Sequence, residues 1–254
     1  MNARLLRFAV FGVASSMLLL FSAPHASASS LCAGRAPTIV GTSGDDTLQG
    51  TASADVIAGL AGNDTITGMQ GNDWICGGPG NDTIDTGGGD VVFAFGDDGH
   101  DVITTGAVSD TGNLYGGAGD DELRPGSGEY FAIYADVGND TVVLGAGFGC
   151  EVYLGDGHDT LQGGSCPVTV DAGAGDDNVR FGSGYRCFAR LGDGDDVLTT
   201  GSCATWVDAG SGNDTVNIGS GETTAYLQAG NDRLSVQGAR VWADGGPDDD
   251  HMST

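Results

Sequence analysis

Residues 41–85 read GTSGDDTLQ, GTASADVIA, GLAGNDTIT, GMQGNDWIC and GGPGNDTID, five copies of a nine-residue unit placed end to end. Every copy opens on glycine, has aspartate at its sixth position and has a branched aliphatic residue at its eighth. The sixth-position aspartates are therefore spaced by nine residues without exception. A fixed period of this size predicts a solenoid, in which each coil packs only on its neighbours.

The unit divides into a loop and a short strand. Its glycines permit positive φ angles and its aspartate favours a turn, whereas residues 64–67 alternate polar and apolar side chains as a strand does. Two units make one coil of about eighteen residues, so that equivalent loops stack at the roughly 4.8 Å spacing of neighbouring strands. We therefore expect an all-β parallel β-roll or β-helix solenoid.

The loop aspartates continue beyond residue 85 at intervals of 18 to 20, although the nine-residue rhythm is lost. One column of loops therefore persists along the chain. Its last copy, GGPDDDH (245–251), is degenerate, and this alignment places Asp249 in register with the loop aspartates of the column. The second column keeps its aspartate only at Asp55 and Asp73 and then becomes plain turns. We expect aspartate loops on both edges over 41–90 and mainly on one edge over 91–250.

Stacked aspartates need a counter-charge. Two carboxylates one rung apart repel each other by roughly 1 kcal/mol even in water, whereas Ca²⁺ accepts six to eight oxygens from carboxylates and exposed carbonyls. A disordered Gly/Asp-rich segment is the alternative, which five phased copies argue against. The predicted metal ligands are Asp46, Asp55, Asp64, Asp73, Asp82, Asp101, Asp121, Asp140, Asp159, Asp177, Asp196, Asp214 and Asp232.

The repeats resemble the calcium-binding nonapeptide G-G-x-G-x-D-x-U-x of the RTX (repeats-in-toxin, hemolysin-type) family. The resemblance implies a parallel β-roll with Ca²⁺ between adjacent turns, ligated by sixth-position aspartates and loop carbonyls. It is strong over 41–85 and is carried by one loop per coil over 86–249. Toxins, proteases and lipases of this group carry a separate active domain and a C-terminal export signal, whereas repeats fill this chain. A cytolytic or hydrolytic role is therefore not carried over.

The N-terminal residues have the pattern of a secretory signal peptide: Arg4 and Arg7, an apolar run over 8–21, and an Ala-Ser-Ala cleavage motif ending at Ala28. A membrane anchor is the alternative, but the run is short for a span. Loss of residues 1–28 removes two of nine basic residues and no acid, which leaves seven against 35, a net charge of −28. We expect a secreted, extracellular protein that binds cations and neither nucleic acid nor membrane.

The alternation of apolar and polar residues along each strand predicts a narrow core inside the coil. Apolar residues such as Val142 and Leu144 stand two and four positions after a loop aspartate, with polar residues between them. The inward residues of the opposite strand stand seven positions before each aspartate, at Leu114, Ile133, Val152, Val170, Ala189, Val207, Ala225 and Trp242. Residues 29–40 are expected to form an N-terminal cap on the first coil.

Six cysteines in an exported chain predict three disulfides, formed by Cys32, Cys76, Cys150, Cys166, Cys187 and Cys203. We prefer the pairs Cys150–Cys166 and Cys187–Cys203, which lie on successive rungs. Elimination then gives Cys32–Cys76, which would tie the cap to the roll. A zinc site is the rival interpretation, but no CxxC or Cys/His cluster occurs.

Three tyrosines each stand six positions before a loop aspartate, where the alternation along the strand points the side chain outward: Tyr115, Tyr134 and Tyr153. This spacing predicts an exposed aromatic ladder. Such a ladder could stack on a sugar or a partner. Stacked identical side chains also stabilise neighbouring rungs, and we favour this structural role.

Catalysis has little support in the sequence. His100 and His158 occupy the variable fifth position of loops, and no histidine is placed as the base of a nucleophile. The cluster Arg180, Arg186 and Arg190 is expected to offset Asp176 and Asp177.

We therefore predict a non-enzymatic, calcium-driven structural or interaction module of a bacterial surface, with extracellular polysaccharide or cell-surface components as candidate partners. The alternatives are a polysaccharide-active parallel β-helix enzyme of lyase or epimerase type, and a carbohydrate-binding adhesin that uses the tyrosine ladder.

Overall fold

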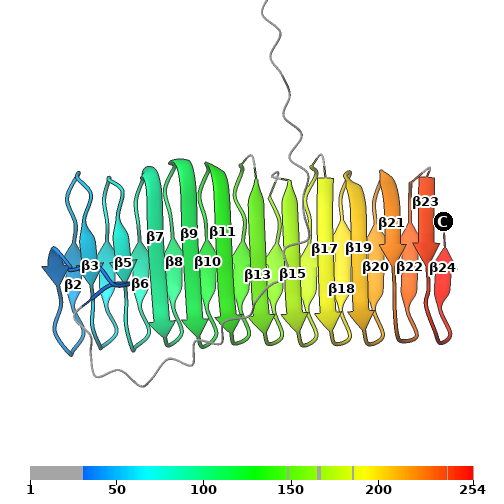
Figure 1. The fold of residues 1–254 in the computed structure, drawn as a ribbon, viewed down its shortest axis with the longest axis horizontal. Coiled ribbons are helices and arrows are strands. Elements are labelled where there is room, and N and C mark those ends of the chain that lie inside the picture. The colour runs from blue at the N-terminus through cyan, green and yellow to red at the C-terminus, as the bar shows by residue number, and fades with distance from the viewer. Residues whose placement is uncertain (1–30, 148, 165–166, 185, 239, 254) are drawn as a thin grey trace, which may run out of the picture.

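The structure, a computed structural model, describes residues 31–147, 149–164, 167–184, 186–238 and 240–253. Figure 1 shows a single solenoid in which coil follows coil along one axis, from the blue to the red end. Within these residues each coil gives one strand to each of two parallel sheets, and each sheet has twelve strands. The predicted all-β parallel solenoid is confirmed. The described residues contain no helix that could cross a membrane.

The first sheet joins the odd-numbered strands and the second joins the even-numbered ones. The odd strands are β1 Ile39–Val40, β3 Val56–Ala58, β5 Trp74–Cys76, β7 Gly89–Asp98, β9 Val108–Ala118, β11 Gly128–Val137, β13 Cys150–Asp156, β15 Val168–Ala174, β17 Arg186–Asp193, β19 Ala204–Ser211, β21 Glu222–Tyr226 and β23 Arg240–Asp244. The even strands are β2 Thr47–Gln49, β4 Thr65–Thr67, β6 Thr83–Asp85, β8 Val102–Thr104, β10 Glu122–Arg124, β12 Thr141–Val143, β14 Thr160–Gln162, β16 Asn178–Arg180, β18 Val197–Thr200, β20 Thr215–Ile218, β22 Arg233–Val236 and β24 His251–Ser253.

The strand register reproduces the spacing of the loop aspartates. Thr47 pairs with Thr65, eighteen residues on, and Val102 pairs with Glu122, twenty residues on. The odd strands lengthen from three residues in β3 and β5 to ten or eleven in β7, β9 and β11. The coil therefore grows on one side while the even strands stay short.

A single narrow core runs through the coils. The predicted inward residues from Leu114 to Ala225 are buried, and so are the pairs typified by Val142 and Leu144. Trp242 is an exception, because 51 % of its surface is exposed and Ala243 takes the inward register next to Ala225. The same shift makes Asp250, not Asp249, the last aspartate in register, since the Asp232 amide donates to Asp250 Oδ1 at 3.1 Å.

A second inward position lies five residues before the loop aspartate and was not predicted. The early copies have glycine there, whereas the later coils alternate alanine and leucine, all of them fully buried: Ala135, Leu154, Ala172, Leu191, Ala209 and Leu227. These residues fill the core of the coils from β11 onward. Because the first repeats carry glycine at this position, the pattern of residues 41–85 could not reveal it.

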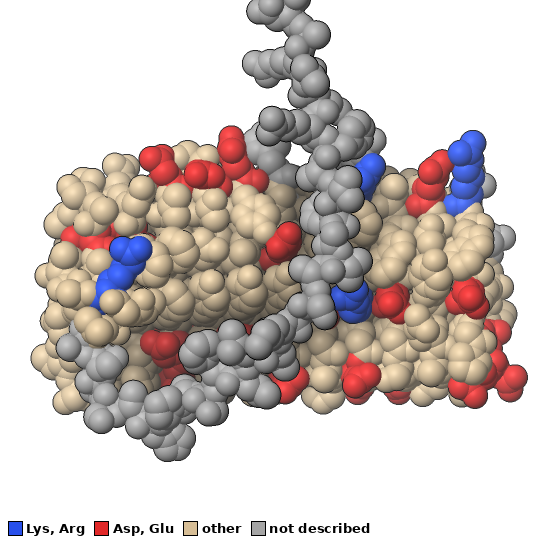
Figure 2. Space-filling model, viewed as in Figure 1, with Lys and Arg blue, Asp and Glu red and all other residues tan. Residues whose placement is uncertain are grey.

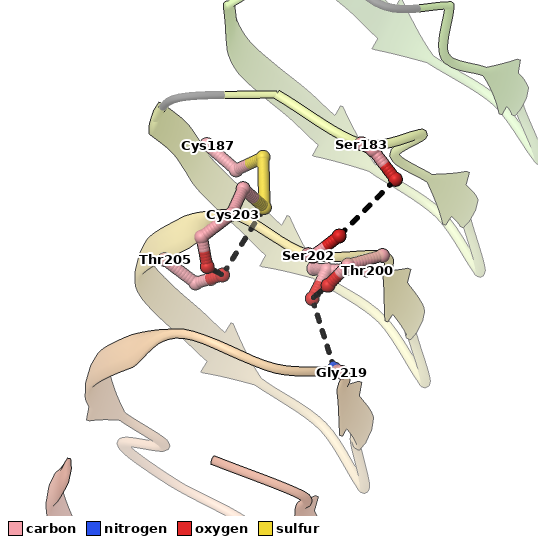
Figure 3. The surroundings of a disulfide bond; sticks show 8 residues. Ser183, Cys187, Thr200, Ser202, Cys203, Thr205 and Gly219 are labelled. Carbon is pink, nitrogen blue, oxygen red and sulfur yellow. Dashed lines mark hydrogen bonds between the residues drawn. A yellow bond between two sulfur atoms is a disulfide. The ribbon is translucent and has the colours of Figure 1, made fainter. Parts of the chain in front are cut away.

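Two of the predicted disulfides are present. Cys187 on β17 joins Cys203 just before β19, with Cα atoms 6.0 Å apart, and Figure 3 shows this bond beside the stacked turns of Ser183 and Ser202. Cys32 joins Cys76 on β5, with Cα atoms 5.5 Å apart. The predicted pair Cys150–Cys166 includes Cys166, which lies outside the described residues.

The described part of the predicted cap, residues 31–40, contacts the side of the roll. Cys32 packs with Ala58 and Cys76 in a small cluster separate from the main core. The Arg35 guanidinium lies over the Trp74 ring, 3.8 Å from its centroid. Residues 39–40 then add the end strand β1 to the first sheet, by pairing with β3. The predicted signal peptide, 1–28, lies outside the described residues.

Candidate metal centre

The first column of loop aspartates forms one continuous hydrogen-bonded ladder. The backbone N–H of each aspartate donates to Oδ1 of the aspartate in the next coil, at N–O distances of 2.7 to 3.1 Å. The ladder contains Asp46, Asp64, Asp82, Asp101, Asp121, Asp140, Asp159, Asp177, Asp196, Asp214, Asp232 and Asp250. One carboxylate oxygen of each is thus held in a fixed position.

The other oxygen of these carboxylates is buried without a hydrogen bond. Among the described residues this holds for Oδ2 of Asp64, Asp82, Asp101, Asp121, Asp140, Asp159, Asp177, Asp196, Asp214 and Asp232, and also for Oδ2 of Asp73, which belongs to the second column. At the start of the roll, Asp46 and Asp55 instead accept bonds from Thr42 and Thr51. A buried carboxylate oxygen with no partner is costly, so the row requires a proton or a cation.

The glycine at the first position of the early loops stands where carboxylate and carbonyl oxygens converge. A β-carbon built on Gly59 would lie 2.2 Å from Asp64 Oδ2 and 2.5 Å from the Gly77 carbonyl oxygen. A β-carbon on Gly96 would meet Asp101 Oδ2 and the Gly116 carbonyl at the same distances, 2.2 and 2.5 Å. These contacts leave no room for a side chain at the first position and show that carboxylate and carbonyl oxygens, the donors that Ca²⁺ prefers, lie close together there.

Carboxylates alone do not complete any site in the described part of the chain. No group of three or more histidine, cysteine, aspartate or glutamate side chains comes together there as metal ligands. Each gap between coils is bordered by two ladder aspartates and by loop carbonyls, which could complete a site for a cation. Carboxylate and carbonyl oxygens suit a hard dication such as Ca²⁺ better than zinc.

Burial raises the pKa values of these buried aspartates, including Asp73 of the second column. Burial raises the pKa of Asp73, Asp121 and Asp196 to about 6, of Asp82, Asp101, Asp140 and Asp214 to about 7, and of Asp177 to about 8. The ladder hydrogen bond lowers each pKa and the neighbouring acids raise it, but burial is the largest cause. Figure 2 shows how few basic side chains accompany the acids on the face it displays. Among the described residues no ion pair includes an aspartate of the ladder, so the column has no cationic partner there.

The second column has carboxylates only in the first coils. The Asp55 amide donates to Asp73 Oδ1 at 2.9 Å, which repeats the ladder geometry. In the next coil the equivalent position is Val92, since Trp74 pairs with Phe93. In the following coils the residues at this position of the register are buried and carry no carboxylate: Gly112, Phe131, Cys150, Val168, Cys187, Thr205 and Thr223. On this edge the core and the Cys187–Cys203 disulfide occupy the place of the metal ligands.

A third ladder, which the sequence did not reveal, links the fifth positions of the loops. Their δ1 atoms each accept the backbone N–H of the next coil, at 2.7 to 3.2 Å. The acceptors are Asp45, Asn63, Asn81, His100, Asp120, Asn139, His158, Asp176, Asp195, Asn213 and Asn231. His100 and His158 each accept a backbone N–H through Nδ1, which gives them a structural role.

The tyrosines of the predicted ladder and Arg190 lie on the first sheet, whereas Arg180 lies on β16 of the second sheet. Tyr115, Tyr134 and Tyr153 stack in one column, with centroids 4.9 Å apart and ring planes within 4°. Arg190 pairs with Asp171 at 3.2 Å, so its predicted partners Asp176 and Asp177 are wrong.

The comparison with known families agrees with this geometry. The family model of the RTX calcium-binding nonapeptide repeat matches residues 40–75, 59–93, 77–112, 113–131, 153–185 and 190–216, which is more than half of the chain. No curated protein matches the chain. The matched segments include aspartates of both columns and most of the coils in which only the first column persists. The chain belongs to the RTX calcium-binding nonapeptide repeat family.

Proposed function

We propose that this protein is a secreted calcium-ion-binding β-roll whose folding is driven by Ca²⁺. The observation that carries the proposal is the row of buried aspartate Oδ2 atoms without hydrogen-bond partners. Ions between successive coils would be held by two ladder carboxylates and loop carbonyls. The bound ion would supply the positive charge that the column lacks, and the aspartates of the ladder would orient it.

The proposed place of action is outside the cell. Two disulfides among the described residues favour an oxidising compartment, and the N-terminal sequence has the pattern of a signal peptide. Extracellular calcium is plentiful, so affinities of roughly 10⁻⁴ to 10⁻³ M per site would suffice. Before export the acidic chain would stay expanded, because each binding site exists only in the folded state.

We further propose that the role is structural or interactive rather than enzymatic. His100 and His158 each accept a ladder hydrogen bond through Nδ1, which assigns them a structural role. The buried acids are accounted for as metal ligands. The alternative of a polysaccharide lyase or epimerase would be favoured by release of unsaturated or reducing sugar ends from alginate or pectin.

Calcium is expected to induce the β-structure cooperatively. Metal-free, oxidised protein at neutral pH should show little β signal by far-UV circular dichroism, because the ionised column repels itself. Addition of Ca²⁺ should raise the signal along a steep curve, since each coil is stabilised by its neighbours. Mg²⁺ is the control and should be much weaker, because it demands a tighter octahedral site. A full β spectrum in chelator would contradict the proposal.

Asp140→Asn is expected to raise the calcium midpoint by about three- to tenfold, since one ligand charge is lost from the middle of the column. The same change should leave the metal-free chain no less ordered, because it removes a buried charge whose pKa is raised to about 7. Asp110→Asn is the matched control, an exposed acid outside both columns, and should leave the midpoint unchanged. Equal effects of the two variants in the calcium titration would argue against a column site.

Low pH is expected to stabilise the metal-free roll in part, because protons can neutralise the buried carboxylates in place of calcium. Because burial raises the column pKa values above 3.8, to about 7 for Asp82 and Asp214, the folded chain binds more protons than the unfolded chain between about pH 4 and pH 8. Stability without metal should therefore fall as the pH rises through this window. With Ca²⁺ the trend should reverse, because the ion binds carboxylates only after they lose their protons. Circular dichroism at several pH values measures both, and a metal-free signal that grows with pH would refute the assignment.

A further inference from the structure

The tyrosine stack on the outer face of the first sheet has one open end. Phe95, Tyr115, Tyr134 and Tyr153 occupy the same register on β7, β9, β11 and β13, with neighbouring centroids 4.7 to 4.9 Å apart and planes within 6°. The inner rings of Tyr115 and Tyr134 are covered on both faces by their neighbours. Tyr153 is covered only by Tyr134, because the next coil has Asp171 in this register.

A groove of about 510 Å³ begins where the stack stops. Tyr153 borders it on one side, and Phe188 and Trp206 border it on the other, two and three strands further along the sheet. Between them β15 contributes only short side chains, Thr169 and Asp171. Tyr153 and Phe188 are both 40 % exposed, which is high for large rings in a solenoid whose other apolar residues are mostly buried.

The groove also contains polar groups of both kinds. The Asp171 carboxylate and the Arg190 guanidinium lie 3.2 Å apart, and both side chains are accessible to solvent. A carboxylate offers only acceptors and a guanidinium offers only donors, arranged in a fixed fork. Side by side, the pair can accept from one hydroxyl group and donate to its neighbour. Vicinal hydroxyl groups on a ring present this combination.

We propose that this groove binds a pyranose unit of an oligosaccharide. The sugar ring stacks its C–H face on the open face of Tyr153, about one rung beyond the last tyrosine, at the roughly 4.8 Å spacing of the coils. In that position it lies over β15, and its hydroxyl groups meet Asp171 and Arg190. A second sugar unit then reaches Phe188 or Trp206. The missing aromatic ring of the ladder is thus supplied by the ligand.

Other flat ligands fit the groove less well. An aromatic ring would also stack on Tyr153, but it would leave the Asp171–Arg190 pair desolvated without new hydrogen bonds. A phosphorylated ligand would meet Arg186 and Arg190, but also the Asp171 carboxylate, in a protein of net charge −26. A sugar stacks and replaces the lost water contacts at the same time, so it is the occupant that satisfies both halves of the groove.

The test uses purified, calcium-loaded protein on an array of neutral and uronic-acid oligosaccharides, followed by calorimetric titration of the best hit. We expect binding, and Tyr153→Ala should weaken it at least about tenfold because the stacking face is lost. Tyr153→Phe should retain binding, and Asp171→Asn should weaken it while leaving the stack intact. Trp242→Ala is the control, since Trp242 is exposed on the same sheet but lies outside the groove, and it should bind as the unaltered protein does.

The inference rests on the proposed function only in that the roll must be folded. Circular dichroism of every sample separates the two claims. A folded protein that binds no oligosaccharide, or one in which Tyr153→Ala binds as tightly as Trp242→Ala, overturns the groove assignment and leaves the calcium proposal standing. A chain that stays unfolded with calcium contradicts the proposed function and this inference together. Selective binding of neutral or of uronic-acid sugars, lost in Tyr153→Ala, supports the site and identifies its ligand class.

Discussion

The whole roll depends on one repeated contact, the hydrogen bond from the backbone N–H of each loop aspartate to Oδ1 of the next. It forms because the chain returns to the same point every 18 to 20 residues. The contact fixes the carboxylate and leaves its second oxygen buried without a hydrogen bond. Folding therefore buries a line of charges, and a cation between the coils is the physical solution that the loop carbonyls permit.

The two edges of the roll differ in how many buried carboxylates they carry. In the first coils the odd strands are three residues long, the core is small, and aspartates occupy both edges. From Val92 onward the second edge loses its carboxylates and gains buried apolar residues, longer strands and a disulfide. Apolar burial contributes roughly 25 cal/mol per Å² without any ligand. The N-terminal coils should thus depend on metal more strongly than the later ones.

Much of this architecture could be predicted from the sequence, because a fixed period specifies a solenoid directly. The coil length, the two edges and the strand parity all follow from the spacing of aspartates and aliphatic residues. The sequence alignment is wrong by one residue in the last coil, because any of the three consecutive aspartates 248–250 could be aligned with the loop aspartates. As a result Trp242 was predicted to be buried, whereas its side chain is exposed. The fifth-position ladder was missed for a chemical reason: asparagine, aspartate and histidine look unrelated as letters, yet each offers an acceptor at its δ1 atom.

The most direct test of the account is a crystal structure of the calcium-loaded protein with anomalous scattering from the ion. We predict peaks between successive coils along the column from Asp64 to Asp232, each bordered by Oδ2 atoms of two aspartates. A peak is also expected between the Asp55 and Asp73 loops, and none along the later turns of that edge. Absence of ions from the aspartate column, or equal occupancy of the plain turns, would contradict the central claim.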